Sequence, residues 1–204
     1  TSGQKKSEFQ AQLIAKEVLR DAMKELLSSR SDSDKRTTVC RIVRAKIVEI
    51  VLPIVEKGLE TAEKALKQDK GNLEKQITVE IYQKAVGQLK LFAKSGCETF
   101  LMDVVIQPLT SDLLTGDKVK AQLAESGIID LVQSADALLR ALSDSLYFVL
   151  DIVNVAIAAS QSITQADKDA TAAVDALGLQ TELVPQIDLL LEKLKEQFLD
   201  FWAC

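Results

Sequence analysis

The sequence contains no histidine, and its 204 residues include only three cysteines. The absence of histidine removes the commonest general base, the usual partner of a serine or cysteine nucleophile, and the commonest transition-metal ligand. Cys40, Cys97 and Cys204 are too few for a four-sulfur zinc site and form no CxxC pair. The sequence also lacks glycine-rich phosphate loops and EF-hand calcium loops. We therefore expect a protein that is not an enzyme and that uses neither a metal nor a cofactor.

Glycine, proline and aromatic residues are also scarce, with 8 Gly, 3 Pro, 6 Phe, 2 Tyr and 1 Trp. Sheet-rich folds need these residue types for their turns and faces, so their scarcity disfavours such folds. At 47% hydrophobic and 27% charged residues, the chain has the composition of an ordered protein with a core. The composition predicts an all-α fold, and we expect a single helical domain over residues 1–204.

Apolar residues recur at spacings of three and four along most of the chain, which is the helical period. The pattern predicts an elongated bundle of about six helices, with helical segments at about residues 7–29, 34–69, 72–94, 97–115, 127–161, 166–177 and 181–203. A brief turn is expected at residues 117–126. Pro53 lies on the polar side of segment 34–69, where water can solvate the carbonyl that it frees. We expect one kinked helix there, with two separate helices as the alternative.

Segment 127–161 is the most apolar part of the chain and predicts one long, mostly buried helix. Polar residues recur along it every three or four positions and trace one narrow line; they are Asp130, Gln133, Asp136, Arg140, Asp144, Tyr147, Asp151 and Asn154. A charged side chain near the centre of a bilayer costs about 2.5–3.5 kcal/mol, and this line contains several. We therefore expect no stable transmembrane span, but a rod wrapped by other helices with its polar line in water.

The three cysteines allow one disulfide and one remaining thiol. Cys40 shares a helical face with Val43 and Ile47, so we expect it to be an ordinary buried apolar residue. Cys97 and Cys204 each lie at the expected end of an element. Either a bridge between these two residues or two free thiols is compatible with the sequence.

Charge is unevenly distributed between the two halves of the sequence. Residues 1–100 carry 19 Lys or Arg against 14 Asp or Glu, net +5, while residues 101–204 carry 6 against 16, net −10. We expect this difference to help the halves dock. A weaker alternative is an anion-binding patch for phospholipid or nucleic acid, made of Arg30, Lys35, Arg36, Arg41, Arg44 and Lys46. Because their helical phases scatter and no aromatic residue lies among them, we expect no nucleic-acid partner.

The apolar surface of segment 127–161 and of the chain's end exceeds what a two-sided bundle needs. We therefore expect a non-catalytic helical protein that binds or sequesters a lipid, a fatty acid-like molecule or another apolar ligand between its helices. The candidate ligand-binding residues are Leu142, Leu146, Val149, Val153, Ile157, Leu194, Phe198 and Phe201. The pattern is similar to that of secreted helical lipid binders. This resemblance implies secretion, and a cytoplasmic location stays open.

Two other functions remain open. The heptad-like seam of the last segment favours an interaction or structural module that binds a partner protein or a second copy of the chain through exposed helix faces. The third alternative, which ranks last, is a protein that is soluble in one state and inserts segment 127–161 into a membrane in another. Snorkelling of Arg140 and protonation of Asp144 and Asp151 would drive that insertion.

Overall fold

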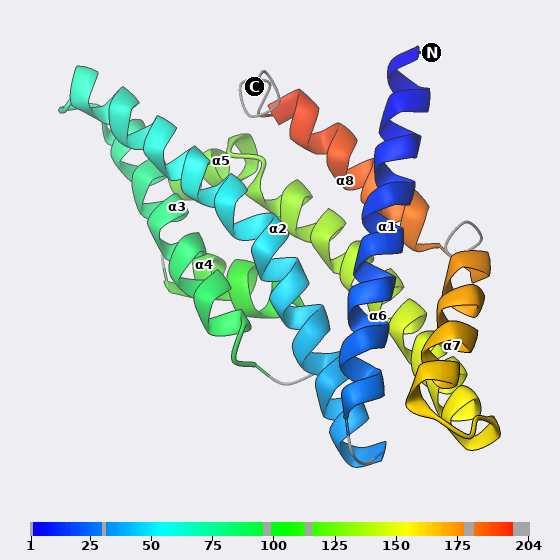
Figure 1. The fold of residues 1–204 in the computed structure, drawn as a ribbon. Helices are drawn as coiled ribbons and strands as arrows, with labels where there is room; N and C mark the ends of the chain where they lie inside the picture. The colour runs from blue at the N-terminus through cyan, green and yellow to red at the C-terminus, as the bar shows by residue number, and fades with distance from the viewer. Residues whose placement is uncertain (1, 30–31, 96–98, 113–115, 178–181, 198–204) are drawn as a thin grey trace. The chain divides into compact units, whose positions relative to one another are not determined.

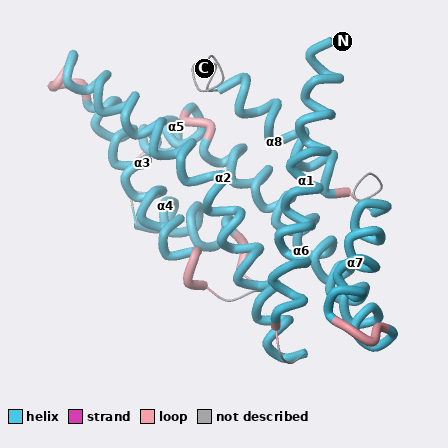
Figure 2. Tube along the Cα trace, viewed as in Figure 1, coloured by secondary structure: helices cyan, strands magenta, loops and turns pink. Residues whose placement is uncertain are grey.

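The computed structural model describes residues 2–29, 32–95, 99–112, 116–177 and 182–197. Within these ranges the chain is helical apart from short connections, and no strand occurs (Figures 1 and 2). The elements are α1 (Ser2–Ser28), α2 (Asp32–Gln68), α3 (Leu73–Phe92), the π-helical turn η1 (Met102–Ile106), α4 (Gln107–Asp112), α5 (Asp117–Glu125), α6 (Ile128–Ala159), α7 (Ile163–Leu177) and α8 (Leu183–Gln197). The all-α prediction is confirmed, with eight α-helices in these ranges rather than about six.

The helices group into two compact units. The first unit joins Thr1–Val43 to Ala137–Lys193, and the second joins Arg44–Asp136 to Leu194–Cys204. Helices α2 and α6 each contribute residues to both units. Each unit therefore combines part of the basic half of the sequence with part of the acidic half. The expectation of a single domain stays a prediction.

In the first unit, α7 packs on α1 through small side chains. Ala166, Ala170 and Val174 follow one another at spacings of four on α7 and are buried, so the α7 backbone can lie close to its neighbour. An ion pair between Arg20 of α1 and Asp175 of α7, at 2.7 Å, borders this contact. Both side chains are substantially exposed, so the pair contributes at most about 1 kcal/mol. The apolar contact is the main source of stability here.

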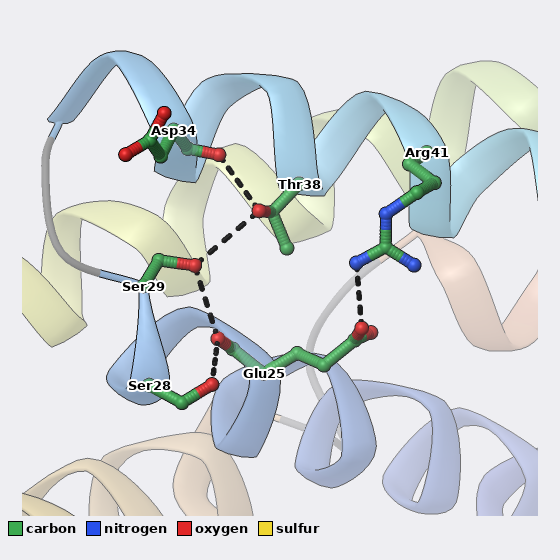
Figure 3. A network of polar contacts seen from close by, with 6 residues as sticks. All are labelled: Glu25, Ser28, Ser29, Asp34, Thr38 and Arg41. Atoms are coloured by element: carbon green, nitrogen blue, oxygen red, sulfur yellow. Dashed lines mark hydrogen bonds and ion pairs between the residues drawn. The ribbon is translucent and has the colours of Figure 1, made fainter.

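The connection from α1 to α2 is fixed by polar contacts around Glu25 (Figure 3). The hydroxyls of Ser28 and Ser29 donate to the Glu25 carbonyl oxygen at 2.8 and 3.2 Å. Arg41 of α2 donates to the Glu25 carboxylate at 2.6 Å, and the Thr38 hydroxyl lies 3.3 Å from that of Ser29. One residue of α1 thus satisfies its own helix end and holds the start of α2.

In the second unit, Pro108 explains the π-helical turn that precedes α4. Proline has no N–H, and in a regular helix its ring clashes with the carbonyl four residues earlier. The turn widens before Pro108, so that the Gln107 N–H bonds to the Met102 carbonyl five residues back. The single helix expected at 97–115 is therefore wrong, because its described part is η1 followed by α4. The turn expected at 117–126 is also wrong, because Asp117–Glu125 forms α5.

Gly127 links α5 to α6 with a φ of 75°, a value that glycine adopts without strain. The Ile128 N–H at the start of α6 donates to the Ser126 hydroxyl at 3.2 Å. From there α6 runs unbroken over 32 residues, which confirms the long helix expected at 127–161. Helix α2 is also continuous through Pro53, whose side is exposed, so the alternative of two helices is wrong.

The polar line of α6 is not a single exposed file, because Asp136 is buried. Its two carboxylate oxygens accept the backbone N–H groups of Leu101 and Met102 at 2.6 and 2.9 Å. Those N–H groups begin the η1–α4 segment and have no partner within their own helix. Asp136 therefore caps a neighbouring helix, whereas Asp130, Arg140, Asp144 and Asp151 are exposed as predicted.

Cys40 is buried, but its expected role as an ordinary apolar side chain is wrong because it is disulfide-bonded. The two remaining cysteines, Cys97 and Cys204, both lie outside the described residues. A disulfide at Cys40 uses one of these two, so the Cys97–Cys204 bridge considered above and the alternative of two free thiols there do not apply.

A close approach between α2 and α3 depends on Gly58. The Tyr82 ring packs against the Gly58 backbone, and the Tyr82 hydroxyl donates to the Ser126 carbonyl oxygen at 3.1 Å. Burial raises the pKa of the Tyr82 hydroxyl, so it stays a neutral donor at physiological pH. The hydrogen bond holds the ring in place and leaves it little freedom to move.

We expect Gly58→Ala to lower the free energy of unfolding by about 1–3 kcal/mol, because the new Cβ would lie 2.9 Å from the Tyr82 Cζ. Gly87→Ala in α3 is the matched control, since a Cβ there meets nothing within 4 Å. That variant should gain up to about 1 kcal/mol from helix propensity. Urea denaturation of both variants measures the difference. Equal stability of the two would contradict the proposed close packing.

Asp136→Asn should lower the free energy of unfolding by about 1–3 kcal/mol, because an amide has one acceptor oxygen and leaves a buried N–H unpaired. Asp144→Asn, which changes an exposed position of the same helix, should stay within about 0.5 kcal/mol of the wild type. Urea denaturation followed by circular dichroism compares the two. Wild-type stability of Asp136→Asn would show that the cap is dispensable.

Candidate functional site

The predicted ligand-binding residues on α6 mostly belong to the packed interior. Leu142, Leu146, Val149 and Val153 are at most 2% exposed, whereas Ile157 is 41% exposed. The side chain of Leu194 and both Phe198 and Phe201 lie outside the described residues. The structure therefore brings four of the eight residues together in the core of the first unit, and ligand binding there stays a prediction.

The C-terminal half of α6 carries exposed apolar side chains instead. Phe148 and Val155 are 60% and 68% exposed, and Ile163 at the start of α7 is 78% exposed. Phe148, Ile152, Val155 and Ala159 are spaced four, three and four, so they share one face of the helix. We call these four residues the α6 stripe. Single exposed apolar residues are ordinary, but an aligned series is typical of a contact surface.

A groove of about 430 Å³ lies along α8 beside α1, and we call it the α1–α8 groove. Its volume falls within the range of about 300–1,000 Å³ that is usual for small-molecule sites. Gln12 of α1 forms one side, and the α8 residues are Val184, Pro185, Gln186, Asp188, Leu189 and Glu192. Leu189 is exposed in the groove, so a ligand would cover it.

The polar groups of the α1–α8 groove are acidic or uncharged. The Gln186 Oε1 atom is buried, yet it has no hydrogen-bond partner. Such an unpaired buried acceptor costs about 1–3 kcal/mol, which a ligand with a donor group would relieve. Glu192 is half-buried and forms neither a hydrogen bond nor an ion pair with the described residues. No basic side chain is among the described residues that line the groove.

Sequence reasoning missed the groove because it concentrated on the inward seam of the last helix. That seam is correct where it is described, since Leu183, Ile187 and Leu190 are buried. The available signal was the presence of Val184, Pro185 and Leu189 off the seam, on the side expected to be polar. Apolar residues outside a buried seam indicate a second contact surface on the same helix.

The basic residues considered as an anion site are not assembled into a patch. Lys35 is buried, and its Nζ donates to Asn154 Oδ1 at 3.3 Å. Arg41 is paired with Glu25, as Figure 3 shows, and Lys46 lies 3.5 Å from a Glu49 carboxylate oxygen. Within the described residues these side chains serve helix contacts, so the alternative of an anion-binding patch loses its basis.

Two further observations bear on function. Among the described residues, no group of His, Cys, Asp or Glu is arranged to hold a metal ion. In the same part of the chain, α6 is long and apolar enough to cross a membrane by length and composition, a test that core helices of soluble proteins also pass. Buried residues make up 44% of its most apolar stretch.

Comparison of the chain with protein-family models, with curated proteins and with solved structures finds no match. The argument about function therefore depends on the α1–α8 groove and the α6 stripe alone.

Proposed function

We propose that this protein is a non-catalytic carrier that binds the tail of a lipid-like molecule in the α1–α8 groove. The observation that carries the proposal is a groove of small-molecule size with an apolar wall of Val184, Pro185 and Leu189. A hydrocarbon tail covering this wall would remove it from water, and the gain is about 0.8 kcal/mol for each buried methylene.

The proposed site is on the surface of the first unit rather than in its interior. Leu146 and Val153 already have packed neighbours, so a ligand among them would have to separate the helices. Protein interiors are packed as densely as organic crystals, and such separation is costly. The α1–α8 groove requires no opening of this kind.

We also infer that the protein works outside the reducing cytoplasm. Cys40 is disulfide-bonded, and structural disulfides persist mainly in secreted and other extracytoplasmic proteins. A carrier of apolar molecules is useful in such aqueous compartments, where free lipid is poorly soluble.

Binding of a neutral alcohol series tests the carrier function. We expect the affinity to rise about fourfold for each added methylene from octanol to dodecanol, which corresponds to the gain of about 0.8 kcal/mol. Leu189→Gln should weaken dodecanol binding about fivefold, because it removes apolar surface from the groove. Leu73→Gln, at an exposed leucine of α3 outside the groove, should bind as the wild type does. Absence of dodecanol binding in calorimetry would eliminate the proposal.

A second candidate function is favoured by the α6 stripe. We propose, as the alternative, an interaction module in which this stripe contacts a second copy of the chain. An isologous contact needs the same apolar surface on both copies, and Phe148 supplies a large exposed ring for it.

Sedimentation velocity tests this alternative. If the stripe mediates self-association, the wild type should dimerise at micromolar concentration, and the double variant Phe148→Ser, Val155→Ser should shift the dissociation constant upward at least about tenfold. Leu73→Ser is the matched control for loss of exposed apolar surface. A wild-type protein that stays monomeric over the whole range would remove the alternative.

A further inference from the structure

We propose that the α1–α8 groove selects lipid-like molecules with a cationic, hydrogen-bond-donating head group, namely single-chain long-chain amines. This inference rests on the proposed carrier function and names its ligand class. Three features of the groove carry it: the unpaired Gln186 Oε1, the Glu192 carboxylate, and the absence of any basic side chain among the described lining residues.

The unpaired oxygen defines what the head group must supply. Gln186 follows Pro185 at the start of α8, and its Oε1 is buried beside the apolar wall. A carbonyl oxygen accepts hydrogen bonds, so its natural partner is an O–H or N–H group. An ammonium group carries three such donors and can bond to this oxygen and to a carboxylate at the same time.

The carboxylates decide the charge of the ligand. Asp188 and Glu192 lie about one turn apart on α8, and both line the groove. A glutamine amide can present its nitrogen instead of its oxygen after a half-turn of its last torsion. In either orientation, the two carboxylates would repel the anionic head group of an ionised fatty acid. The groove is therefore complementary to an ammonium and not to a carboxylate.

The tail and the head group occupy neighbouring parts of one site. Leu189 lies between Gln186 and Glu192 in the sequence, so the apolar wall continues directly beside the polar groups. A molecule that fills the groove must combine an apolar chain with a donor at one end. A short amine has no chain to cover Leu189, and an alkane has nothing to satisfy Gln186.

Calorimetric titration at pH 7 with four probes tests the proposal, each probe being kept below its micelle concentration. We expect dodecylamine to bind about tenfold more tightly than dodecanol, from the added charge-assisted hydrogen bond. Dodecanoate should bind more weakly than dodecanol, and butylamine should bind much more weakly than dodecylamine. Equal affinities of dodecylamine and dodecanoate would overturn the head-group preference. Equal affinities of butylamine and dodecylamine would overturn the lipid-like ligand.

Two substitutions separate the contributions of the polar groups. Gln186→Leu should weaken binding of both dodecylamine and dodecanol about tenfold, because it removes the acceptor that both use. Glu192→Gln should weaken dodecylamine binding about threefold and leave dodecanol binding unchanged, since only the amine is charged. Glu63→Gln, which changes an exposed glutamate of α2, is the matched control. An unchanged dodecylamine affinity in both groove variants would overturn the assignment.

A structural role for Gln186 predicts a different result from a ligand-binding one. Replacement of an unpaired buried amide by an apolar side chain of similar size should leave the urea midpoint of the unliganded protein unchanged or raise it. A lowered midpoint would show that Gln186 holds the fold together, and the proposal would fall. If dodecanol binds but shows no disadvantage against dodecanoate, the carrier function stands and the head-group assignment fails. If no probe binds, both fail.

Discussion

The structure depends on burying the apolar surface of α6. This helix contributes its N-terminal turns to the second unit and the rest to the first, and both units use it as a core element. Eleven of its large or small apolar side chains are buried as far as Val153: Ile128, Leu131, Val132, Ala135, Leu138, Leu139, Ala141, Leu142, Leu146, Val149 and Leu150 precede that residue. Full burial of one large side chain contributes about 1.5–3 kcal/mol. By comparison, the exposed ion pairs of the molecule contribute little.

The polar residues of α6 show how far the sequence predicts the fold. Their spacing correctly predicted a continuous helix with charged groups in water, because helical periodicity depends only on local geometry. It could not predict that Asp136 turns inward to cap the segment that begins at Leu101. That role depends on where a distant helix end lies, and sequence spacing carries no such information. In the same way, the π-helical turn before Pro108 follows from a backbone clash that a count of apolar residues does not register.

The candidate site was predicted less well, for a related reason. Periodicity identifies which face of a helix is apolar, but it does not say how completely neighbouring helices cover that face. Leu146 and Phe148 are two positions apart on α6, yet one is fully buried and the other is largely exposed. The apolar excess noticed in the sequence is real, but it lies partly on the α6 stripe and partly along α8. Its location became clear only when the neighbours of each helix were known.

The two surfaces of the first unit differ in what they can recognise. The α6 stripe presents apolar side chains beside Asp144 and Asp151, which are well solvated and need no partner. The α1–α8 groove contains a polar atom that is already out of contact with water and unpaired. Desolvation of that atom costs free energy in the folded protein before any ligand arrives, so a ligand that donates to it recovers the cost without a new desolvation penalty. For this reason the groove favours a specific head group, whereas the stripe offers only apolar area.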